Sequence, residues 1–333
     1  MGLQSNRQQE LQAWAARVLG IPAPVLEPAS ADASFRRYFR TSAAGRSVIL
    51  MDAPPPQEDC RPFVRVAGLL REAGVHAPTV QAQDLERGFL LLDDLGTQTY
   101  LDILRDDNAD ALFADAVATL IRWQAASRPA TLPAYDRALL HRELSLFPDW
   151  YVARHLRLEL ATGEKRMLDE LFQQLQDSAL AQPQVYVHRD FMPRNLMVSD
   201  PNPGVLDFQD AVYGPISYDV LSLFKDAFIS WDEKRIEGWR RSYWEGARRV
   251  GLSVPEPGEF KRAFDWIGLQ RHLKVIGIFA RINYRDGKPQ YLKDIGRFLK
   301  YVRDTGRLYK EFTPLLKLLD SLESRAGRQA VIT

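Results

Sequence analysis

The sequence predicts an α+β protein of two lobes, with a small N-terminal lobe built on an antiparallel β-sheet and one helix, and a large, mainly helical C-terminal lobe. The first observation is that the strand-like runs of the N-terminal part lie before residue 93. The second is that the segments after residue 109 have mostly helical spacing. A chain of 333 residues, 46% of them hydrophobic, is long enough for two cores. We therefore expect domains at residues 1–93 and 94–333.

The N-terminal lobe is expected to begin with a helix over residues 8–19, which Gly20 ends. Two strand-like runs, 35–40 and 47–52, surround a turn at Gly45 and predict a hairpin. A helix over 61–73 and a third apolar strand over 89–92 complete the lobe. An antiparallel sheet crossed by one helix is the expected result.

The C-terminal lobe follows a connecting segment, Asp93-Asp94-Leu95-Gly96, which leads into a helix near Thr99. Its helices are expected over residues 109–125, 139–157, 165–179, 215–228, 234–250, 260–279, 291–304 and 313–325. This organisation favours ATP in a cleft between the lobes and an acceptor on the helical side.

The segment 185–210, VYVHRDFMPRNLMVSDPNPGVLDFQD, carries the chemistry. Short apolar strands at 185–187 and 196–198 enclose a tight loop that holds Asp190 and Asn195, and a third apolar run ends at Asp207. Phosphoryl transfer needs one carboxylate to orient and deprotonate a hydroxyl, and oxygen ligands to hold Mg²⁺ on the phosphates. Asp190 is the expected base, and Asn195 and Asp207 are the expected Mg²⁺ ligands. His188 is expected to be structural, bonded to the loop backbone.

The composition narrows the classes of partner. A net charge of +1 gives no case for binding nucleic acid or an anionic membrane, although residues 256–333 contain 16 basic against 9 acidic side chains. The single cysteine, Cys60, excludes an intrachain disulfide and fits a reducing compartment. The start of the chain has no apolar signal segment, and no stretch approaches the length of a membrane span. We therefore expect a cytoplasmic protein that acts on small molecules.

The block VHRDFMPRNLMV followed by GVLDFQDAVYGPISYDVLSL, with FLLLDDLG before it, resembles the aminoglycoside phosphotransferase and choline kinase superfamily. The resemblance implies a two-lobed, protein-kinase-like fold, ATP as co-substrate and Mg²⁺. It makes Asp190 the catalytic base, Asn195 and Asp207 the metal ligands, and Asp219 a structural aspartate under the catalytic loop.

Protein kinases share the His-Arg-Asp triplet and the following Asn. Here Asp207 is followed by Phe208-Gln209 where they have Phe-Gly, the Ala-Pro-Glu triplet is missing, and only a short stretch precedes Pro215. A peptide-docking activation segment does not fit, so a small acceptor is favoured.

Two departures from the kinase pattern concern the nucleotide phosphates. The glycine-rich loop is replaced by SADAS at residues 30–34, whose small residues, Ser34 among them, still allow backbone N–H groups to approach phosphate. Met51 stands where a kinase has its phosphate-binding lysine. Either Arg36 or Arg37 on the neighbouring strand replaces that cation, or Mg²⁺ alone serves.

Within the superfamily, the segments SADASFRRYFR, VILMDAPP and FLLLDDLGTQTYLDIL resemble bacterial anomeric kinases of cell-wall recycling. That resemblance implies phosphorylation of the C1 hydroxyl of N-acetylmuramate and N-acetylglucosamine. The basic C-terminal helices are compatible with the carboxylate of N-acetylmuramate. Two alternatives stay open: a kinase of another small hydroxyl compound such as an aminoglycoside, and a pseudokinase that binds nucleotide without chemistry.

The remaining candidates for the site are assigned by position. Asp94, Leu95 and Met197 are expected at the nucleotide, with Met197 on the floor of the adenine site. Sugars are commonly held by aromatic faces and fixed polar groups. The candidates for the acceptor are Glu143, Trp150, Gln209, Asp210, Arg271 and His272.

Overall fold

The computed structural model describes residues 2–31 and 35–332 and divides the chain into two compact units. We call them the sheet unit, Met1–Ala126 with Pro193–Ala211, and the helical unit, Ser127–Met192 with Val212–Thr333. The predicted α+β fold is confirmed, whereas the domain boundary at residue 93 stays a prediction. Within the described residues, every helix is too short or too polar to cross a membrane.

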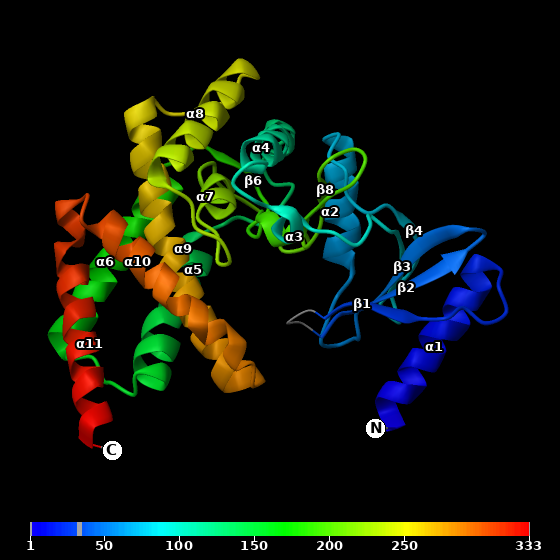
Figure 1. The fold of residues 1–333 in the computed structure, drawn as a ribbon, viewed down its shortest axis with the longest axis horizontal. Helices are drawn as coiled ribbons and strands as arrows, with labels where there is room; N and C mark the ends of the chain where they lie inside the picture. The colour runs from blue at the N-terminus through cyan, green and yellow to red at the C-terminus, as the bar shows by residue number, and fades with distance from the viewer. Residues whose placement is uncertain (1, 32–34, 333) are drawn as a thin grey trace. The chain divides into compact units, whose positions relative to one another are not determined.

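The sheet unit contains a five-stranded antiparallel sheet with the strand order β1-β2-β3-β5-β4 (Figure 1). Its strands are β1 (Glu27–Ala31), β2 (Arg37–Ala43), β3 (Arg46–Asp52), β4 (Val80–Asp84) and β5 (Phe89–Asp93). The predicted hairpin is β2–β3, where Ala43 pairs with Arg46. Its two loop residues, Ala44 and Gly45, both have positive φ, as a tight turn between right-twisted strands requires.

The two faces of this sheet differ in what covers them. Helix α1 (Gly2–Leu19) packs Leu11 and Trp14 on the face that carries Phe39, Val48, Leu50, Phe89 and Leu91. Because successive strand residues alternate, Tyr38, Arg40, Ile49 and Leu92 point to the opposite face. That second face lines the pocket described below.

The rest of the sheet unit is helical and looped. Its further elements are α2 (Arg61–Glu72), α3 (Tyr100–Ile103), α4 (Ala109–Ala125), the 3₁₀ turn η2 (Pro193–Asn195), β7 (Leu196–Met197) and β8 (Gly204–Val205). Met197 pairs with Gly204, and it also forms a bridge to Thr99. The segment that carries Asn195 is thereby attached to the connection after β5.

The helical unit contains one strand pair and several helices. Its elements are α5 (Arg137–Leu146), the π-helix η1 (Phe147–His155), α6 (Thr162–Leu180), β6 (Gln184–Val187), β9 (Val212–Pro215), α7 (Tyr218–Phe224), α8 (Glu233–Arg249), α9 (Pro257–Asp286), η3 (Pro289–Asp294), α10 (Ile295–Gly306), η4 (Lys310–Phe312) and α11 (Thr313–Ile332). Strands β6 and β9 pair antiparallel.

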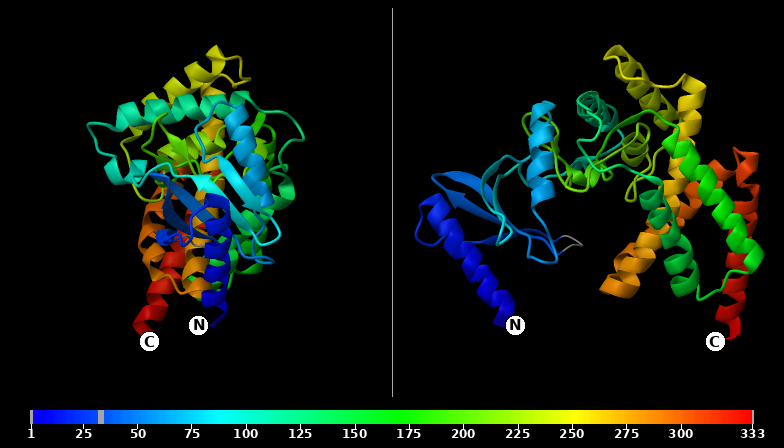
Figure 2. Two further views of the ribbon diagram at one scale, coloured as in Figure 1. Left: turned by 90° about the vertical axis from the view of Figure 1, so that its right-hand side faces the viewer. Right: turned by 180° about the vertical axis from the view of Figure 1, so that it is seen from behind.

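Helix α9 is the centre of this unit. It contacts α5, η1, α6, α7 and α10, and it runs lengthwise through the helical part, yellow to orange, in Figures 1 and 2. Nearly every residue between Phe264 and Ala280 is buried, as expected of a helix surrounded by others. Among them are polar side chains, Asp265, Gln270, Arg271, His272 and Lys274, which need partners inside the protein.

Several boundaries differ from the predictions. The helix expected over 139–157 is α5 followed by a π-helix, and Pro148 in the first turn of η1 cannot donate the hydrogen bond that would continue the α-helix. The helix expected from Pro215 begins at Tyr218, because Val212–Pro215 pairs as β9 with the distant β6. The strands β1 and β4 were not predicted, since EPASA and VQAQD are polar edge strands.

We predict that Gly277→Ala in α9 destabilises the protein by about 2 kcal/mol or more. A Cβ at this position would overlap the backbone carbonyl group of Leu146, which cannot move aside as a side-chain end could. The matched control is Gly238→Ala in α8, where a Cβ meets no atom within 4 Å and helix propensity should raise stability by up to about 1 kcal/mol. Urea unfolding measures both changes, and equal effects would contradict the packing argument.

Candidate active site

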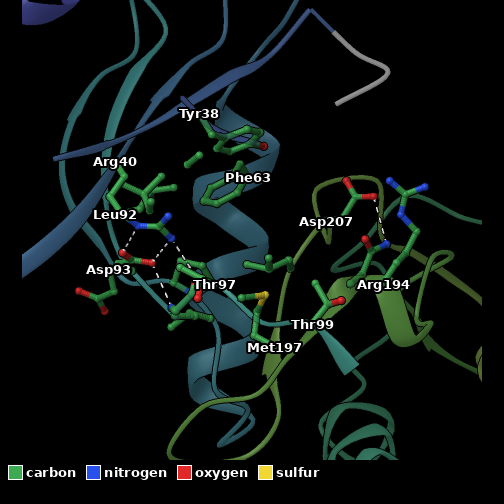
Figure 3. A pocket seen from close by; sticks show the side chains of 18 residues that line it. Tyr38, Arg40, Phe63, Leu92, Asp93, Thr97, Thr99, Arg194, Met197 and Asp207 are labelled. Atoms are coloured by element: carbon green, nitrogen blue, oxygen red, sulfur yellow. Dashed lines mark hydrogen bonds and ion pairs between the residues drawn. The ribbon is translucent and has the colours of Figure 1, made fainter. Parts of the chain in front are cut away.

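A pocket of about 300 Å³ lies within the sheet unit, on the face of the sheet that α1 does not cover. Its lining residues are Ala29, Tyr38, Arg40, Ile49, Phe63, Pro78, Leu92, Asp93, Asp94, Leu95, Gly96, Thr97, Thr99, Arg194, Asn195, Met197, Leu206 and Asp207. Figure 3 shows Arg194 and Asp207 together at one end, and Arg40 with Asp93 at the other. The pocket therefore has an apolar middle and two polar ends.

The apolar middle follows from the register of the sheet. Ile49 pairs with Arg40 on one side and with Leu92 on the other, so the three side chains stand in a row on one face. Phe63 of α2 and Met197 of β7 complete the lining. An apolar slot of this kind suits an aromatic ring.

Arg40 fixes the connection that leaves β5. Its Nε and Nη2 donate to the two carboxylate oxygens of Asp94 at 2.6 and 2.9 Å, and Nη2 also donates to the carbonyl oxygen of Gly96 at 2.9 Å. Burial raises the pKa of Asp94, but hydrogen bonds from Arg40, Ser47 and Gly96 bring it below its ordinary value. Asp94 therefore stays ionised and holds this edge of the pocket rigid.

The other end of the pocket holds the two predicted metal ligands. The amide nitrogen of Asn195 lies 3.3 Å from Oδ2 of Asp207, and Gln209 donates to Oδ1 of Asp207 at 2.8 Å. Asp207 has a φ of 62°, a left-handed conformation that turns the chain two residues after the end of β8. One carboxylate and one side-chain amide in a polar pocket end fit Mg²⁺, which takes few protein ligands and completes its shell with water and phosphate.

In the helical unit, Asp219 of α7 binds the backbone of the loop that contains His188, Arg189 and Asp190, called the catalytic loop after its predicted role. Its carboxylate accepts hydrogen bonds from the backbone N–H groups of His188 at 2.6 Å and Arg189 at 3.0 Å. Burial raises the pKa of Asp219 to about 7, although both hydrogen bonds oppose the rise. The ring of His188 accepts from the backbone N–H of Asp190 at 3.3 Å and is buried, so the predicted bond of His188 to the loop backbone is present.

Glu143 of α5 is the centre of a buried polar network. Its Oε1 lies 2.9 Å from Nζ of Lys274 and 2.5 Å from Nη2 of Arg189. Its Oε2 accepts hydrogen bonds from the side-chain amide of Gln270 at 3.0 Å and from the hydroxyl of Tyr135. Burial alone would raise the pKa of Glu143, but the charges of Lys274 and Arg189 lower it to about 2. Glu143 is therefore a buried carboxylate whose charge is balanced by cations from α9 and from the catalytic loop.

Arg271, one turn before Lys274 on α9, reaches the catalytic loop. Its Nη1 donates to the carbonyl oxygen of Arg189 at 2.8 Å and to the hydroxyl of Tyr218 at 3.0 Å, and Nη2 lies 3.5 Å from Oδ1 of Asp190. Burial raises the pKa of Asp190, but Arg271, Lys274 and Arg189 hold it below its ordinary value. Asp190 is thus ionised at neutral pH.

Of the residues predicted to bind the nucleotide, some line the pocket and others do not. Asp94, Leu95 and Met197 line the pocket, whereas Ser34 lies outside the described residues. Arg37 is paired with Asp52, which Arg7 of α1 also binds, so Arg37 points to the covered face of the sheet. Arg36 is paired with Glu58 at 2.9 Å, just before α2. Met51 is fully buried opposite Tyr38.

The predicted acceptor residues are distributed over both units, with Gln209 and Asp210 in the sheet unit and the other four in the helical unit. Glu143 and Arg271 belong to the buried polar network of the helical unit. Gln209 donates a hydrogen bond to Asp207, and Asp210 is exposed. Trp150 lines a separate hollow with Arg154 and Arg157. His272 is fully buried beside Phe298 and Tyr301. As acceptor contacts, all six stay predictions.

Sequence reasoning missed Arg40, Tyr38 and Phe63 in the pocket and Lys274 in the network. The alternation of β2 could have paired Tyr38 with Arg40 on one face. Nothing in the sequence around Lys274 links it to Glu143, because the two are brought together only by helix packing.

The sequence profile of the phosphotransferase enzyme family matches residues 25–257. The chain belongs to this family. It is a small-molecule kinase with ATP as co-substrate, as the resemblance in the motif block predicts.

Relatives and solved structures agree with this membership. The chain is 58% identical over 307 residues to the N-acetylmuramate/N-acetylglucosamine kinase of Pseudomonas putida, covering 92% of this chain and 91% of the relative. It is 47% identical to the kinase of the same name from Neisseria meningitidis, covering 95% of this chain and 96% of the relative.

Among solved structures, choline kinase LicA from Streptococcus pneumoniae aligns with a TM-score of 0.64 at 12% identity, over 90% of this chain and 99% of that one. The gentamicin complex of the aminoglycoside phosphotransferase APH(2")-IIa aligns with a TM-score of 0.60 at 15% identity, over 87% and 95% of the two chains. At these identities the likeness extends to the fold alone.

We predict that Glu143→Gln lowers the free energy of unfolding at pH 7 by about 3 to 5 kcal/mol, because the buried Lys274 and the partly buried Arg189 lose their common counter-charge. The folded pKa of about 2 lies below the ordinary value of 4.5. The stabilisation by Glu143 is therefore fully present above pH 4.5 and is lost as the pH falls toward 2. Urea unfolding should show that the difference in free energy of unfolding between wild type and variant becomes smaller as the pH falls from 4.5 toward 2.

The matched control for this prediction is Glu170→Gln, whose partner Arg166 and own side chain are both mostly exposed. Its effect should stay below about 0.5 kcal/mol at every pH. If the loss of unfolding free energy in Glu143→Gln did not change with pH, it would come from altered packing and not from the lost charge.

Proposed function

We propose that this enzyme transfers the γ-phosphoryl group of ATP to the C1 hydroxyl of N-acetylmuramate and N-acetylglucosamine, as part of peptidoglycan recycling in the cytoplasm. The observation that carries the proposal is the 58% identity, over more than nine-tenths of both chains, to kinases named for these two sugars in Pseudomonas putida and Pseudomonas aeruginosa. The intact Asp190, Asn195 and Asp207 support a working enzyme over a pseudokinase.

The pocket of the sheet unit is the proposed nucleotide site. Adenine would lie in the apolar slot between the row of β2, β3 and β5 side chains and Met197. The backbone of Asp94, Leu95 and Gly96 borders the slot, and the bonds from Arg40 keep its carbonyl and N–H groups in place. A rigid backbone edge can select a purine by its hydrogen-bonding pattern.

Mg²⁺ is the proposed cofactor, with Asn195 and Asp207 as its protein ligands. When bound, the ion neutralises charge on the phosphates of ATP. Gln209 holds one oxygen of Asp207 at 2.8 Å and so fixes the orientation of that carboxylate. Its proposed part is therefore to support the metal ligand, and Asp210 beside it is proposed at the acceptor.

Asp190 is the proposed base. Its carboxylate accepts the proton of the sugar C1 hydroxyl while the hydroxyl oxygen forms a bond to the γ-phosphorus and the bond from that phosphorus to the β-phosphate oxygen breaks. ADP and a sugar 1-phosphate result. Since the transition state is loose, an ionised carboxylate that orients the hydroxyl suffices, and a strong base is not needed.

The charge around the base agrees with the proposed acceptor. Arg189, Arg271 and Lys274 outnumber Glu143 and Asp190, and the nearby Asp219 has a pKa of about 7, so this cluster carries at most one net positive charge. N-acetylmuramate brings a carboxylate, whereas an aminoglycoside brings several positive charges that this cluster would repel. Trp150 and His272 stay proposed sugar contacts, as an aromatic face and a polar side chain of the kinds that commonly hold sugars.

The decisive experiment incubates the enzyme with ATP, Mg²⁺ and each sugar and records the phosphorus NMR spectrum of the product. A phosphate on C1 couples to the anomeric proton, which a 6-phosphate does not. Asp190→Asn should lower kcat by about 10² to 10⁴-fold with nearly unchanged ATP affinity. Turnover of kanamycin but of neither sugar, or a variant with more than half of wild-type kcat, would refute the proposal or the role of Asp190.

We further predict that Arg36→Ala raises the KM for ATP roughly tenfold to a hundredfold, as expected for the loss of a charge-assisted phosphate contact. Arg37→Ala is the matched neighbour control. Because Arg37 is tied to Asp52 on the α1 face, its loss should lower the melting temperature and leave the KM for ATP nearly unchanged. If both variants keep wild-type kinetics, neither arginine replaces the lysine that Met51 displaced.

A further inference from the structure

The catalytic loop is held at its peptide groups from two sides. Asp219 binds the backbone N–H groups of His188 and Arg189. Arg271 binds the carbonyl oxygen of Arg189, the peptide group that leads directly into Asp190. The peptide group between Arg189 and Asp190 is thus bound at its carbonyl oxygen by Arg271 and at its N–H by the ring of His188, and Asp219 binds the N–H of the peptide group before it, so the backbone before Asp190 has little freedom to rotate.

Arg271 also approaches the side chain of Asp190, the residue that follows this peptide group. Its Nη2 lies 3.5 Å from Oδ1 of Asp190, while its Nη1 is engaged by the Arg189 carbonyl and by Tyr218. The distance of 3.5 Å is that of an ion pair and exceeds a normal hydrogen bond. The guanidinium therefore attracts the carboxylate without a short hydrogen bond to Oδ1.

Arg271 is itself held in place. Its side chain is 6% exposed, and Tyr218 accepts hydrogen bonds from both Arg271 and Lys274. Lys274 is in turn anchored to the buried Glu143 at 2.9 Å. Because Arg271 and Lys274 are three residues apart on α9, they share one face of the helix. Because Arg271 is buried in this network, its guanidinium has one low-energy position. The side chain of Asp190 is 38% exposed and less confined, so the position of Arg271 can set the direction of its carboxylate.

We propose that Arg271 is a positioning residue for the base: it sets the direction of the Asp190 carboxylate and fixes the backbone that carries it. The proposal rests on the proposed role of Asp190 in phosphoryl transfer and adds α9 to the machinery. Two separate donors of one planar group are needed, since the carbonyl and the carboxylate are bound at different nitrogens. A lysine, with its single ammonium group, can satisfy only part of this arrangement.

The test is chemical rescue of Arg271→Ala. We expect kcat to fall about a hundredfold, as for a small displacement of a catalytic group, while the KM values for ATP and sugar change little. Guanidinium chloride at millimolar concentration, far below denaturing levels, should restore part of the lost kcat by occupying the vacated site. Arg271→Lys should keep the charge and recover less than a tenth of wild-type kcat.

The controls separate positioning from folding and from the proposed function. Arg285→Ala removes an exposed arginine of the same helix, which pairs with the adjacent Asp286, and should keep wild-type kinetics with and without guanidinium. Asp190→Asn should not respond to guanidinium. Thermal unfolding and ATP binding report whether each variant is folded, and if Arg271→Ala is not, the kcat of Arg271→Lys decides.

Three outcomes would overturn the proposal: wild-type kcat in Arg271→Ala or in Arg271→Lys, a folded Arg271→Ala that guanidinium does not rescue, or a raised KM for N-acetylmuramate with unchanged kcat. The last would make Arg271 an acceptor contact. A wild-type enzyme that phosphorylates neither sugar would instead refute the proposed function. In that case the same comparison of variants can be made with whichever hydroxyl acceptor the enzyme accepts.

Discussion

The helical unit depends on the ionised carboxylate of Glu143, buried among side chains from three separate segments. A buried charge is costly unless it is paired and hydrogen-bonded. Glu143 has such partners only if α5, α9 and the catalytic loop converge, because Lys274 comes from α9 and Arg189 from the loop. The network therefore disfavours any packing of α9 that separates these three elements.

This constraint connects stability with chemistry. The same helix α9 that neutralises Glu143 through Lys274 presents Arg271 to the peptide group before Asp190. Asp219 also stabilises the loop, because it accepts hydrogen bonds from the backbone N–H groups of His188 and Arg189, which would otherwise lack partners. The loop that carries Asp190, the proposed base, is thus fixed by charged groups in the protein interior, where attraction is little screened.

The sheet unit follows a different rule, the alternation of strand side chains. One face of β2 and β3 packs on α1 through Phe39 and Leu50, and the other lines the proposed nucleotide pocket through Arg40 and Ile49. The register couples the two faces, so a slip of one residue would exchange them. The hairpin turn at Ala44 and Gly45 fixes this register.

The sequence by itself determined the chemistry of the reaction and the class of fold. The spacing of Asp190, Asn195 and Asp207 predicts phosphoryl transfer because that reaction needs these groups in a short loop and after the next strand, and most helices follow from local periodicity. Only the tertiary structure decided which arginine faces which side of the sheet, that β6 and β9 pair, and that Arg271 and Lys274 lie beside Asp190 and Glu143. The physical reason is that periodicity identifies which face of an element is buried, whereas the partners of a buried charge come from segments far away in the chain.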